Sequence, residues 1–263
     1  MKSKNNANLP LSVVFICRDN LRDLEETYSS LQNLHDSISE FVIVDSSQGS
    51  EINTFCGNLD FEDRVKYLWE PASGIYHAMN SALKLVSNNN YVWFLNPGDV
   101  MVDENGVRTL LSNLIETDSI WGYGQSIKTI GNRLEVFPAK NFNYNMKNLA
   151  FGQAAISHQA TFCRAKNLVD LGGFDEGLRI AADLKIQILL FQKHEPIFHF
   201  IPLVRIDPNG VSHSRIFLTF LETLRVRWSI KGISRVRVMY SVFEFAATKT
   251  KGRIQKISKE FFR

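Results

Sequence analysis

Residues 91–99, YVWFLNPGD, join a short apolar run to a polar turn that ends in an aspartate. Residues 91–95 are β-branched, aromatic or otherwise apolar and predict a buried strand, while Asn-Pro-Gly predicts a turn. The same arrangement occurs earlier in the chain, where residues 41–44 (FVIV) lead directly into Asp45. Ligands of open α/β sheets bind beyond the carboxyl ends of the strands, so Asp45 and Asp99 are candidate binding residues. The alternative is that each aspartate only begins a loop.

Around these two segments, strands and helices are predicted to alternate. Residues 11–17 (LSVVFIC) and 65–69 favour further strands. Apolar residues recur every three or four positions in residues 20–33, and again from Ile75 to Val86, which predicts two helices. Ser73 is a candidate N-cap for the second. This alternation is typical of βαβ units around a mostly parallel sheet.

The second half of the chain predicts a departure from that pattern. Residues 121–128 and 133–137 flank a Gly-Asn pair, which predicts a hairpin added to the sheet. Residues 164–171, followed by two glycines, and residues 182–193 favour helices, the latter with Ile186, Leu189 and Leu190 facing inward. We therefore expect an α/β fold with a mixed sheet and flanking helices.

Composition excludes several classes of protein. The 263 residues are 44% hydrophobic, 22% charged and 11% aromatic, which is ordinary for a globular chain of one or two domains and excludes disorder and collagen. The three cysteines form no CxxC pair, so we expect neither a zinc site nor a disulfide framework, and a reducing, cytoplasmic compartment. The first apolar run is far shorter than a ~20-residue membrane span.

Positive charge is concentrated at the C-terminus. Residues 214–263 contain twelve Lys or Arg residues and three Glu residues, a net charge of +9. Because the whole chain carries +3, residues 1–213 carry −6. Aromatic and aliphatic residues are interspersed, which predicts a basic amphipathic extension of two helices broken near Lys231-Gly232. It is expected to bind an anionic membrane surface. The alternatives are packing on the preceding domain or a homodimer contact; the acidic body argues against nucleic acid.

Seven segments occur in an order that resembles the inverting family 2 glycosyltransferases of the GT-A fold, in particular those that build bacterial exopolysaccharide, capsule or O-antigen repeat units. They are VVFICRDN, EFVIVDSSQGS, EPASGIYHAMNSAL, YVWFLNPGD, HQATFCR, GGFDE followed by AADL, and NGVS. The resemblance covers about residues 11–212. It implies a GT-A catalytic domain over residues 1–213, a Rossmann-like mixed sheet with flanking helices, followed by the extension 214–263.

The resemblance also implies roles for the aspartates. Asp45 matches the residue that contacts the nucleotide base. Asp99 matches the metal ligand of the DxD-type turn, where Mg²⁺ or Mn²⁺ bridges the donor diphosphate; the other usual carboxylates are replaced by Asn96 and Gly98. Asp183 matches the catalytic base, which removes a proton from the acceptor hydroxyl. The alternative for Asp183 is a helix N-terminal carboxylate favoured by the helix dipole.

The same matches assign further residues to the donor, acceptor and metal sites. The donor site is expected to include Arg18, Gly74, Tyr76, Asn80 and Asn96, and the acceptor side His158 and Gln159. His213 is a second candidate metal ligand, although a solvated loop is an equal alternative. His77 departs from the family, which usually has aspartate there. Trp69 and Trp93 are expected to be core or sheet residues.

Together these matches predict an inverting, metal-dependent transferase that moves a sugar from a nucleotide-sugar, expected to be UDP-linked, to a hydroxyl of a growing glycan. The acceptor is expected to be polyprenyl-diphosphate-linked, which places the protein peripherally on the inner face of the cell membrane. Two alternatives stay open from the sequence: a sugar nucleotidyltransferase, and a catalytically silent nucleotide-binding or scaffolding subunit of a glycan-assembly complex.

Overall fold

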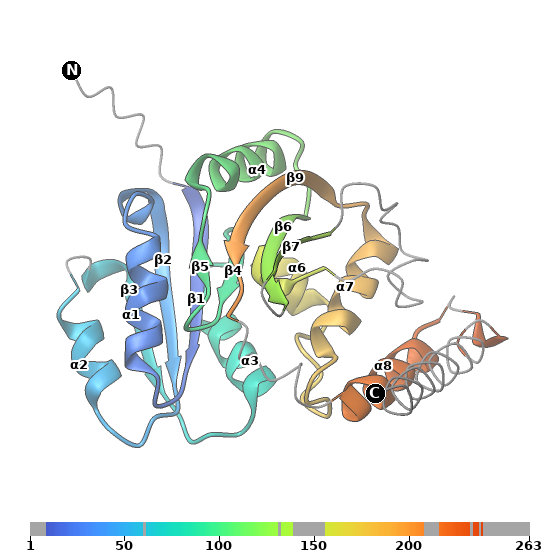
Figure 1. The fold of residues 1–263 in the computed structure, drawn as a ribbon, viewed down its shortest axis with the longest axis horizontal. Helices are drawn as coiled ribbons and strands as arrows, with labels where there is room; N and C mark the ends of the chain where they lie inside the picture. Colours follow the sequence, from blue (N-terminus) through green and yellow to red (C-terminus); the bar gives the residue numbers. More distant parts are fainter. Residues whose placement is uncertain are drawn as a thin grey trace, which may run out of the picture.

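A mixed β-sheet forms the centre of the computed structural model, which describes residues 9–59, 62–130, 133–138, 156–207, 216–231, 234–236 and 238 (Figure 1). The strand order is β3-β2-β1-β4-β8-β6-β9-β5, and β7 pairs with β6. The strands are β1 (Leu9–Cys17), β2 (Ile38–Asp45), β3 (Val65–Trp69), β4 (Tyr91–Leu95), β5 (Val100–Met101), β6 (Trp121–Ile130), β7 (Arg133–Phe137), β8 (Thr161–Arg164) and β9 (Ile197–Arg205). Strands β1 to β4 are mutually parallel, whereas β8 runs antiparallel to both β4 and β6.

Helices cover both faces of the sheet. They are α1 (Leu21–Ser30), α2 (Glu51–Gly57), α3 (Ile75–Leu85), α4 (Glu104–Glu116), α6 (Ala165–Asp170), α7 (Ala182–Lys193) and α8 (Ile216–Ser229). Successive strand residues point to opposite faces, so Val42 and Val44 pack with α3, α6, α7 and α8, while Phe41 and Ile43 pack with α1, α2 and α4. Two apolar cores result, one on each face.

Most predicted elements are confirmed. Strands β3 and β4 and helix α7 have the predicted bounds, and β6 and β7 form the predicted antiparallel hairpin. Its Gly-Asn pair lies outside the described residues. The mixed sheet predicted from that hairpin is confirmed as well.

Three local predictions are wrong, each for a physical reason. The N-cap of α3 is Gly74, at φ 110°, because the chain turns one residue later than predicted, and the Ser73 hydroxyl donates to the Pro71 carbonyl instead. Helix α6 begins after Arg164, which pairs with Tyr91 as part of β8. Ile188, rather than Leu189, is fully buried in α7. The prediction for the two tryptophans is confirmed: Trp69 is the last residue of β3, with 53% of its surface exposed, and Trp93 is fully buried in β4.

The basic extension is described over α8 and a few residues beyond it. Val226 and Ile230 are buried in the same core as α7, so α8 packs on the domain that precedes it. The division of the chain at residue 213 and the break at Gly232, which lies outside the described residues, stay predictions. Among the residues that the structure describes, no helix has the length and apolar character needed to span a bilayer.

Candidate donor and catalytic site

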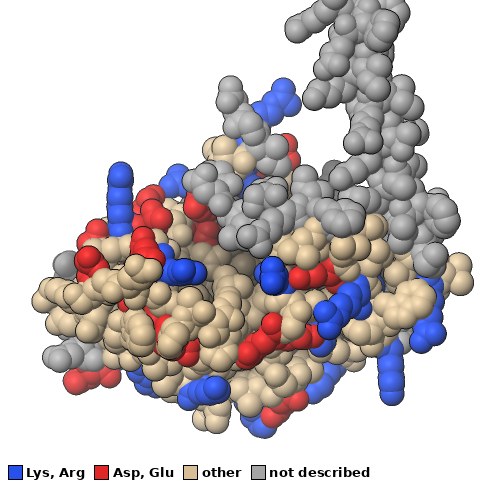
Figure 2. Space-filling view, turned by 90° about the horizontal axis from the view of Figure 1, so that it is seen from below, with Lys and Arg blue, Asp and Glu red and all other residues tan. Residues whose placement is uncertain are grey.

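The carboxyl ends of β1 to β4 lie at one edge of the sheet, at the bottom of Figure 1. Viewed onto this edge, the surface is hollowed near its middle, and Lys, Arg, Asp and Glu side chains lie around the hollow (Figure 2). A mixture of both charges suits a ligand that carries phosphates and hydroxyls. The predicted donor residues can therefore be located relative to this edge.

Asp45 ends β2 and is fully buried. Its Oδ1 accepts the amide N–H of Ser47 at 2.8 Å and the Ser47 hydroxyl at 2.5 Å, and its Oδ2 accepts the Tyr67 hydroxyl at 2.8 Å. Burial and the Asp45 charge raise the pKa of Tyr67 and of Cys56. Asp45 therefore holds the loop after β2 in place, and its contact with a nucleotide base stays a prediction.

The loops after β1 and β2 are joined directly. The Asp19 amide donates to the Ser47 hydroxyl at 2.7 Å, and the Gln48 amide donates to Asp19 Oδ1 at 3.0 Å. Asp19 has a positive φ of 51°, a conformation that Asp tolerates better than most residues. Arg18 projects from this joined pair of loops, with 66% of its side chain exposed. Its Nε lies 3.9 Å from Asp19 Oδ2, so the guanidinium forms an exposed ion pair beside these loops.

The turn after β4 carries Asp99, which is 1% exposed. Its Oδ2 accepts the Asn96 amide at 2.9 Å and its Oδ1 accepts the Asp207 amide at 3.1 Å. Burial raises the pKa of Asp99 to about 6, and the Asp207 charge adds to this, while the two amides and His158 oppose it. Gly98 has a φ of 95°, and a Cβ there would lie 3.3 Å from the Asp207 carboxylate, so a close approach of this carboxylate requires glycine.

Two predicted site residues contact Asp183, the second residue of α7. The Tyr76 hydroxyl donates to Asp183 Oδ1 at 3.5 Å, and His158 Nδ1 lies 3.5 Å from Asp183 Oδ2. His158 Nε2 lies 3.4 Å from Asn96 Nδ2, so the same ring reaches the turn that carries Asp99. The predicted base, acceptor-side histidine and donor-side residues are thus brought together from four separate elements. The side chain of Asp183 is 27% exposed, which leaves it accessible to a hydroxyl.

Tyr76 and Gly74 lie at the start of α3. The Tyr76 ring is buried and stacks on Phe174, with ring centroids 5.8 Å apart. Burial, together with the charges of Asp183 and Glu222, raises the pKa of Tyr76, so it is a hydrogen-bond donor at neutral pH. Gly74 is exposed, and nothing lies within 4 Å of where its Cβ would be, so a ligand has room beside the helix N-terminus.

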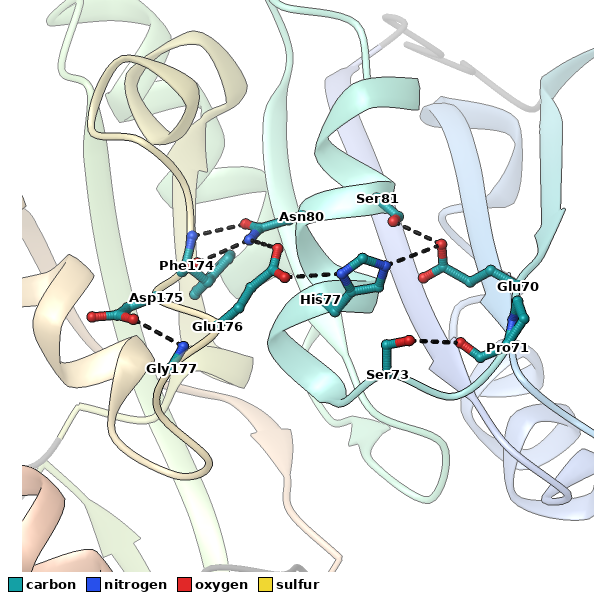
Figure 3. Close-up of polar contacts among 10 residues, drawn as sticks. All are labelled: Glu70, Pro71, Ser73, His77, Asn80, Ser81, Phe174, Asp175, Glu176 and Gly177. Atoms are coloured by element: carbon teal, nitrogen blue, oxygen red, sulfur yellow. Dashed lines mark hydrogen bonds and ion pairs between the residues drawn. The ribbon is translucent and has the colours of Figure 1, made fainter.

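Asn80 and His77, on α3, both contact the loop that contains Phe174 and Glu176. The Asn80 amide accepts from Phe174 N at 2.8 Å and donates to Phe174 O at 2.9 Å and Glu176 Oε1 at 2.8 Å. His77 lies between two carboxylates: Nδ1 is 2.9 Å from Glu176 Oε2, and Nε2 is 3.7 Å from Glu70 Oε2 (Figure 3). Both side chains therefore tie α3 to the Gly-Gly-Phe-Asp-Glu loop. Donor contact by Asn80 stays a prediction.

On the acceptor side, Gln159 is 8% exposed and its backbone carbonyl accepts the Trp93 indole N–H at 2.6 Å. This bond fixes the short turn that presents His158. His213 lies outside the described residues. Within the described part of the chain, no group of three or more His, Cys, Asp or Glu residues is arranged to hold a metal ion.

Sequence reasoning missed two charged residues of the site. Asp207 follows the end of β9 by two residues, and the rule used for Asp45 and Asp99 would have found it if β9 had been recognised as a strand. Lys128 lies on β6; burial lowers its pKa, while the charges of Asp183 and Asp99 raise it. Lys128 is thus influenced by the charges of both aspartates, and no sequence signal distinguishes it from other strand residues.

Comparison with known proteins finds curated relatives and solved structures that resemble this chain. No protein-family model matches the chain. Two curated relatives from Mycobacterium tuberculosis, from strains CDC 1551 and H37Rv, are named uncharacterized glycosyltransferases MT1564 and Rv1514c. Each is 25% identical to this chain over 211 residues, which is 78% of this chain and 78% of the relative.

Solved structures also match the fold of this chain. Staphylococcus aureus TarS gives a TM-score of 0.65 at 16% identity over 90% of this chain, and this chain spans 42% of TarS. TarS 1–349 in complex with UDP-GlcNAc gives 0.65 at 17% identity, over 82% of this chain and 65% of that one. Mannosyltransferase PcManGT from Pyrobaculum calidifontis, with GDP-Man and Mn²⁺, gives 0.62 at 16% identity, over 86% and 66%. The prediction of a GT-A-like glycosyltransferase is confirmed, and membership of family 2 stays a prediction.

Proposed function

We propose that this protein transfers a sugar, with inversion, from a nucleotide-sugar to a hydroxyl of a growing bacterial surface glycan. The observation that carries the proposal is the meeting of Asp183 with Tyr76 and His158 at 3.5 Å, beside the turn that carries Asp99. The donor is taken to be UDP-linked, because the TarS structure of the same fold binds UDP-GlcNAc. A GDP-linked donor, as bound by PcManGT, is the main alternative.

Asp183 acts as the general base in this proposal. Its Oδ1 already accepts the Leu184 amide at 2.7 Å and the Tyr76 hydroxyl, which leaves Oδ2, on the His158 side, to receive the proton of the acceptor hydroxyl. The acceptor oxygen, as it loses its proton, attacks the anomeric carbon on the side opposite the departing nucleoside diphosphate. This single displacement inverts the configuration of the anomeric carbon. His158 holds Oδ2 in position and contacts Asn96 on the donor side.

The donor diphosphate is placed at the edge between the joined β1 and β2 loops and the turn after β4. Arg18, Gly74, Asn96 and Lys128 are assigned to this region in the proposal: the two cations suit phosphate oxygens, and the open space beside Gly74 leaves room for the sugar. Asp45 is assigned to the base end of the nucleotide. Its buried carboxylate orients Ser47, whose loop is then the direct neighbour of the base.

Asp99 and Asp207 are the residues that would hold Mg²⁺ or Mn²⁺, with His213 as a further candidate ligand. Two neighbouring carboxylates fit a hard cation, which is commonly bound by one or two carboxylates together with substrate phosphates. When bound, such a cation neutralises charge on the leaving diphosphate. Asp207 is the more exposed of the two carboxylates, and Asp99 supports it through the Asp207 amide.

Calorimetric titration of UDP, GDP, dTDP and CDP, with and without Mn²⁺, tests the donor site. We expect one nucleotide to bind in a Mn²⁺-dependent manner, and Asp45→Ala and Asp99→Ala to weaken that binding. Binding of a nucleoside triphosphate with release of pyrophosphate would instead support a sugar nucleotidyltransferase. Absence of binding to all four would support a silent scaffolding subunit.

The acceptor is proposed to be polyprenyl-diphosphate-linked and to be reached at the cytoplasmic face of an anionic membrane through residues 214–263. On α8, Leu221, Arg225 and Trp228 are exposed at helical spacing, and the Arg235 guanidinium lies 5.3 Å from the Trp228 ring centroid. Co-sedimentation with phosphatidylglycerol vesicles, compared with phosphatidylcholine vesicles, tests this placement. Salt-sensitive binding reduced by a combined Arg225→Glu and Trp228→Ala change is expected; a concentration-dependent dimer without vesicle binding would contradict it.

A further inference from the structure

Glu222, on α8, accepts N–H groups from three successive residues that precede α7. The Arg179 amide donates to both carboxylate oxygens, at 2.9 and 3.0 Å, the Ile180 amide donates at 2.7 Å, and the Ala181 amide at 3.1 Å. Glu222 is only 8% exposed. A single buried carboxylate therefore accepts hydrogen bonds from three successive backbone N–H groups in a distant part of the chain.

These three amides would otherwise lack partners from α7 itself. The first N–H groups of a helix, and those of its N-cap, have no partner within the helix. The N-cap of α7 is Ala181, which is 2% exposed and has no side chain that could accept a hydrogen bond. Glu222 supplies the missing acceptor, and its negative charge lies at the favourable end of the helix dipole.

The carboxylate is held firmly in place from its own side. Val226 and Ile230, four and eight residues further along, are buried in the core that also contains Ala182 and Ile186 of α7. Helix α8 lies beside α7 in the fold (Figure 1). Glu222 is thus fixed between a packed helix and the loop that leads into α7.

That loop determines where the proposed base lies. Asp183 follows Ala181 by two residues, and its carboxylate contacts Tyr76 and His158 at 3.5 Å. The Glu222 charge also reaches Tyr76, whose pKa it helps to raise after the larger effects of burial and Asp183. A displacement of about 1 Å in a catalytic group can reduce the rate 10²-fold.

We propose that Glu222 is a positioning residue: it fixes residues 179–181 and thereby holds the Asp183 carboxylate in reach of the acceptor hydroxyl. This proposal rests on the proposed function of Asp183. It makes the start of the basic extension part of the catalytic unit, which a membrane anchor alone does not require.

The test compares Glu222→Gln and Glu222→Asp with Glu195→Gln, an exposed glutamate beyond the end of α7. Glu222→Gln replaces one acceptor oxygen with an NH₂ group that faces backbone donors, whereas Glu222→Asp keeps the charge. We expect Glu222→Gln to lower kcat for nucleotide-sugar turnover at least about tenfold, with the donor KM within about twofold. Glu222→Asp should recover part of kcat, and Glu195→Gln should match the wild type.

Hydrogen exchange gives a second measurement that does not depend on turnover. Amides 179–181 should lose protection in Glu222→Gln, while the strands keep theirs. Unchanged kcat and unchanged protection would overturn the proposal. Global unfolding of Glu222→Gln, with wild-type kcat in Glu222→Asp, would overturn it as well, because the role would then be general stability. If the wild-type protein bound and turned over no donor while Glu222→Gln still exposed amides 179–181, the proposed function would fail and the structural role of Glu222 would stand.

Discussion

His158 Nδ1 lies 3.5 Å from Asp183 Oδ2, although the two residues come from different elements and are 25 positions apart. The other ring nitrogen of His158, Nε2, lies 3.4 Å from the side-chain nitrogen Nδ2 of Asn96, in the turn that carries Asp99. One imidazole therefore connects the proposed base with the proposed diphosphate site. This connection explains how the acceptor and donor sides are held in a common geometry.

His158→Ala should reduce kcat for donor turnover about 10- to 100-fold, because Asp183 loses the group that orients its Oδ2. Nucleotide affinity should change little, since Asp45, Arg18 and Asp99 are untouched. Steady-state turnover and calorimetry measure the two quantities separately. His199→Ala, which changes a histidine bonded to Asn113 on α4, is the matched control. A wild-type kcat in His158→Ala would refute the role of the ring.

The stability of the metal-free protein should depend on pH through Asp99. Its folded pKa of about 6 lies above the ordinary 3.8, because burial disfavours the ionised form. Ionisation therefore costs stability, and the free energy of unfolding should fall as pH rises from about 4 to above 6. Relative to Asp99→Asn, the loss should be about 3 kcal/mol at 1.36 kcal/mol per pKa unit.

Urea unfolding in EDTA at a series of pH values measures this difference. Asp170→Asn, at an exposed carboxylate paired with Lys166 on α6, is the control: it keeps Asp99, so its stability should fall with pH as that of the wild type does. Parallel curves for the wild type and Asp99→Asn would show that Asp99 titrates normally.

Asp207→Asn should weaken Mn²⁺-dependent nucleotide binding at least about tenfold, because one of two carboxylates at the proposed metal site becomes neutral. Binding measured in EDTA should stay the same, since this residue approaches the Asn-Pro-Gly-Asp turn rather than the loops after β1 and β2. Calorimetry with and without Mn²⁺ gives both values. An equal loss in the two conditions would mean that Asp207 acts on the fold and not on the metal.

His77→Asp, which restores the residue usual in the family that the sequence resembles, should lower stability by about 1 kcal/mol, or about 2–4 °C in Tm. The new carboxylate would face Glu70 and Glu176, which now contact opposite sides of the imidazole. Adding Glu176→Gln to this variant should recover part of the loss. Thermal unfolding at pH 7 checks both variants. If His77→Asp alone were as stable as the wild type, repulsion from Glu70 and Glu176 would be excluded as the reason for histidine at this position.

The strands around the donor edge could be predicted because their apolar runs are short and continuous, and two of these runs lead to the aspartates Asp45 and Asp99. Helix α4 was not predicted, although Val107, Leu110 and Leu114 recur at helical spacing and Asp103 caps it through Gly106 N. Strand β9 was not predicted because its apolar and polar residues do not alternate and because it contains Pro202. Missing β9 meant missing Asp207, the carboxylate that follows it.

Contacts between distant elements could not be read from the sequence at all. The positions of Asn80 and Tyr76, one turn apart on α3, suggested a shared donor face, but the amide of Asn80 is used to hold Phe174 and Glu176. Glu222 belongs to a segment whose charge suggested membrane binding, and its partners are amides 41 to 43 residues earlier in the chain. Such pairings depend on how helices pack across a sheet, which no local pattern encodes.

Release of nucleoside diphosphate from UDP-GlcNAc, UDP-glucose and GDP-mannose, measured for the wild type, Asp183→Asn and Asp170→Asn, decides whether Asp183 is the general base of a sugar transfer. We predict that the wild type and Asp170→Asn turn over one of these donors. Asp183→Asn should bind the same nucleotide with similar affinity and release it on the order of 10²-fold more slowly. Turnover by Asp183→Asn at the wild-type rate would contradict the account.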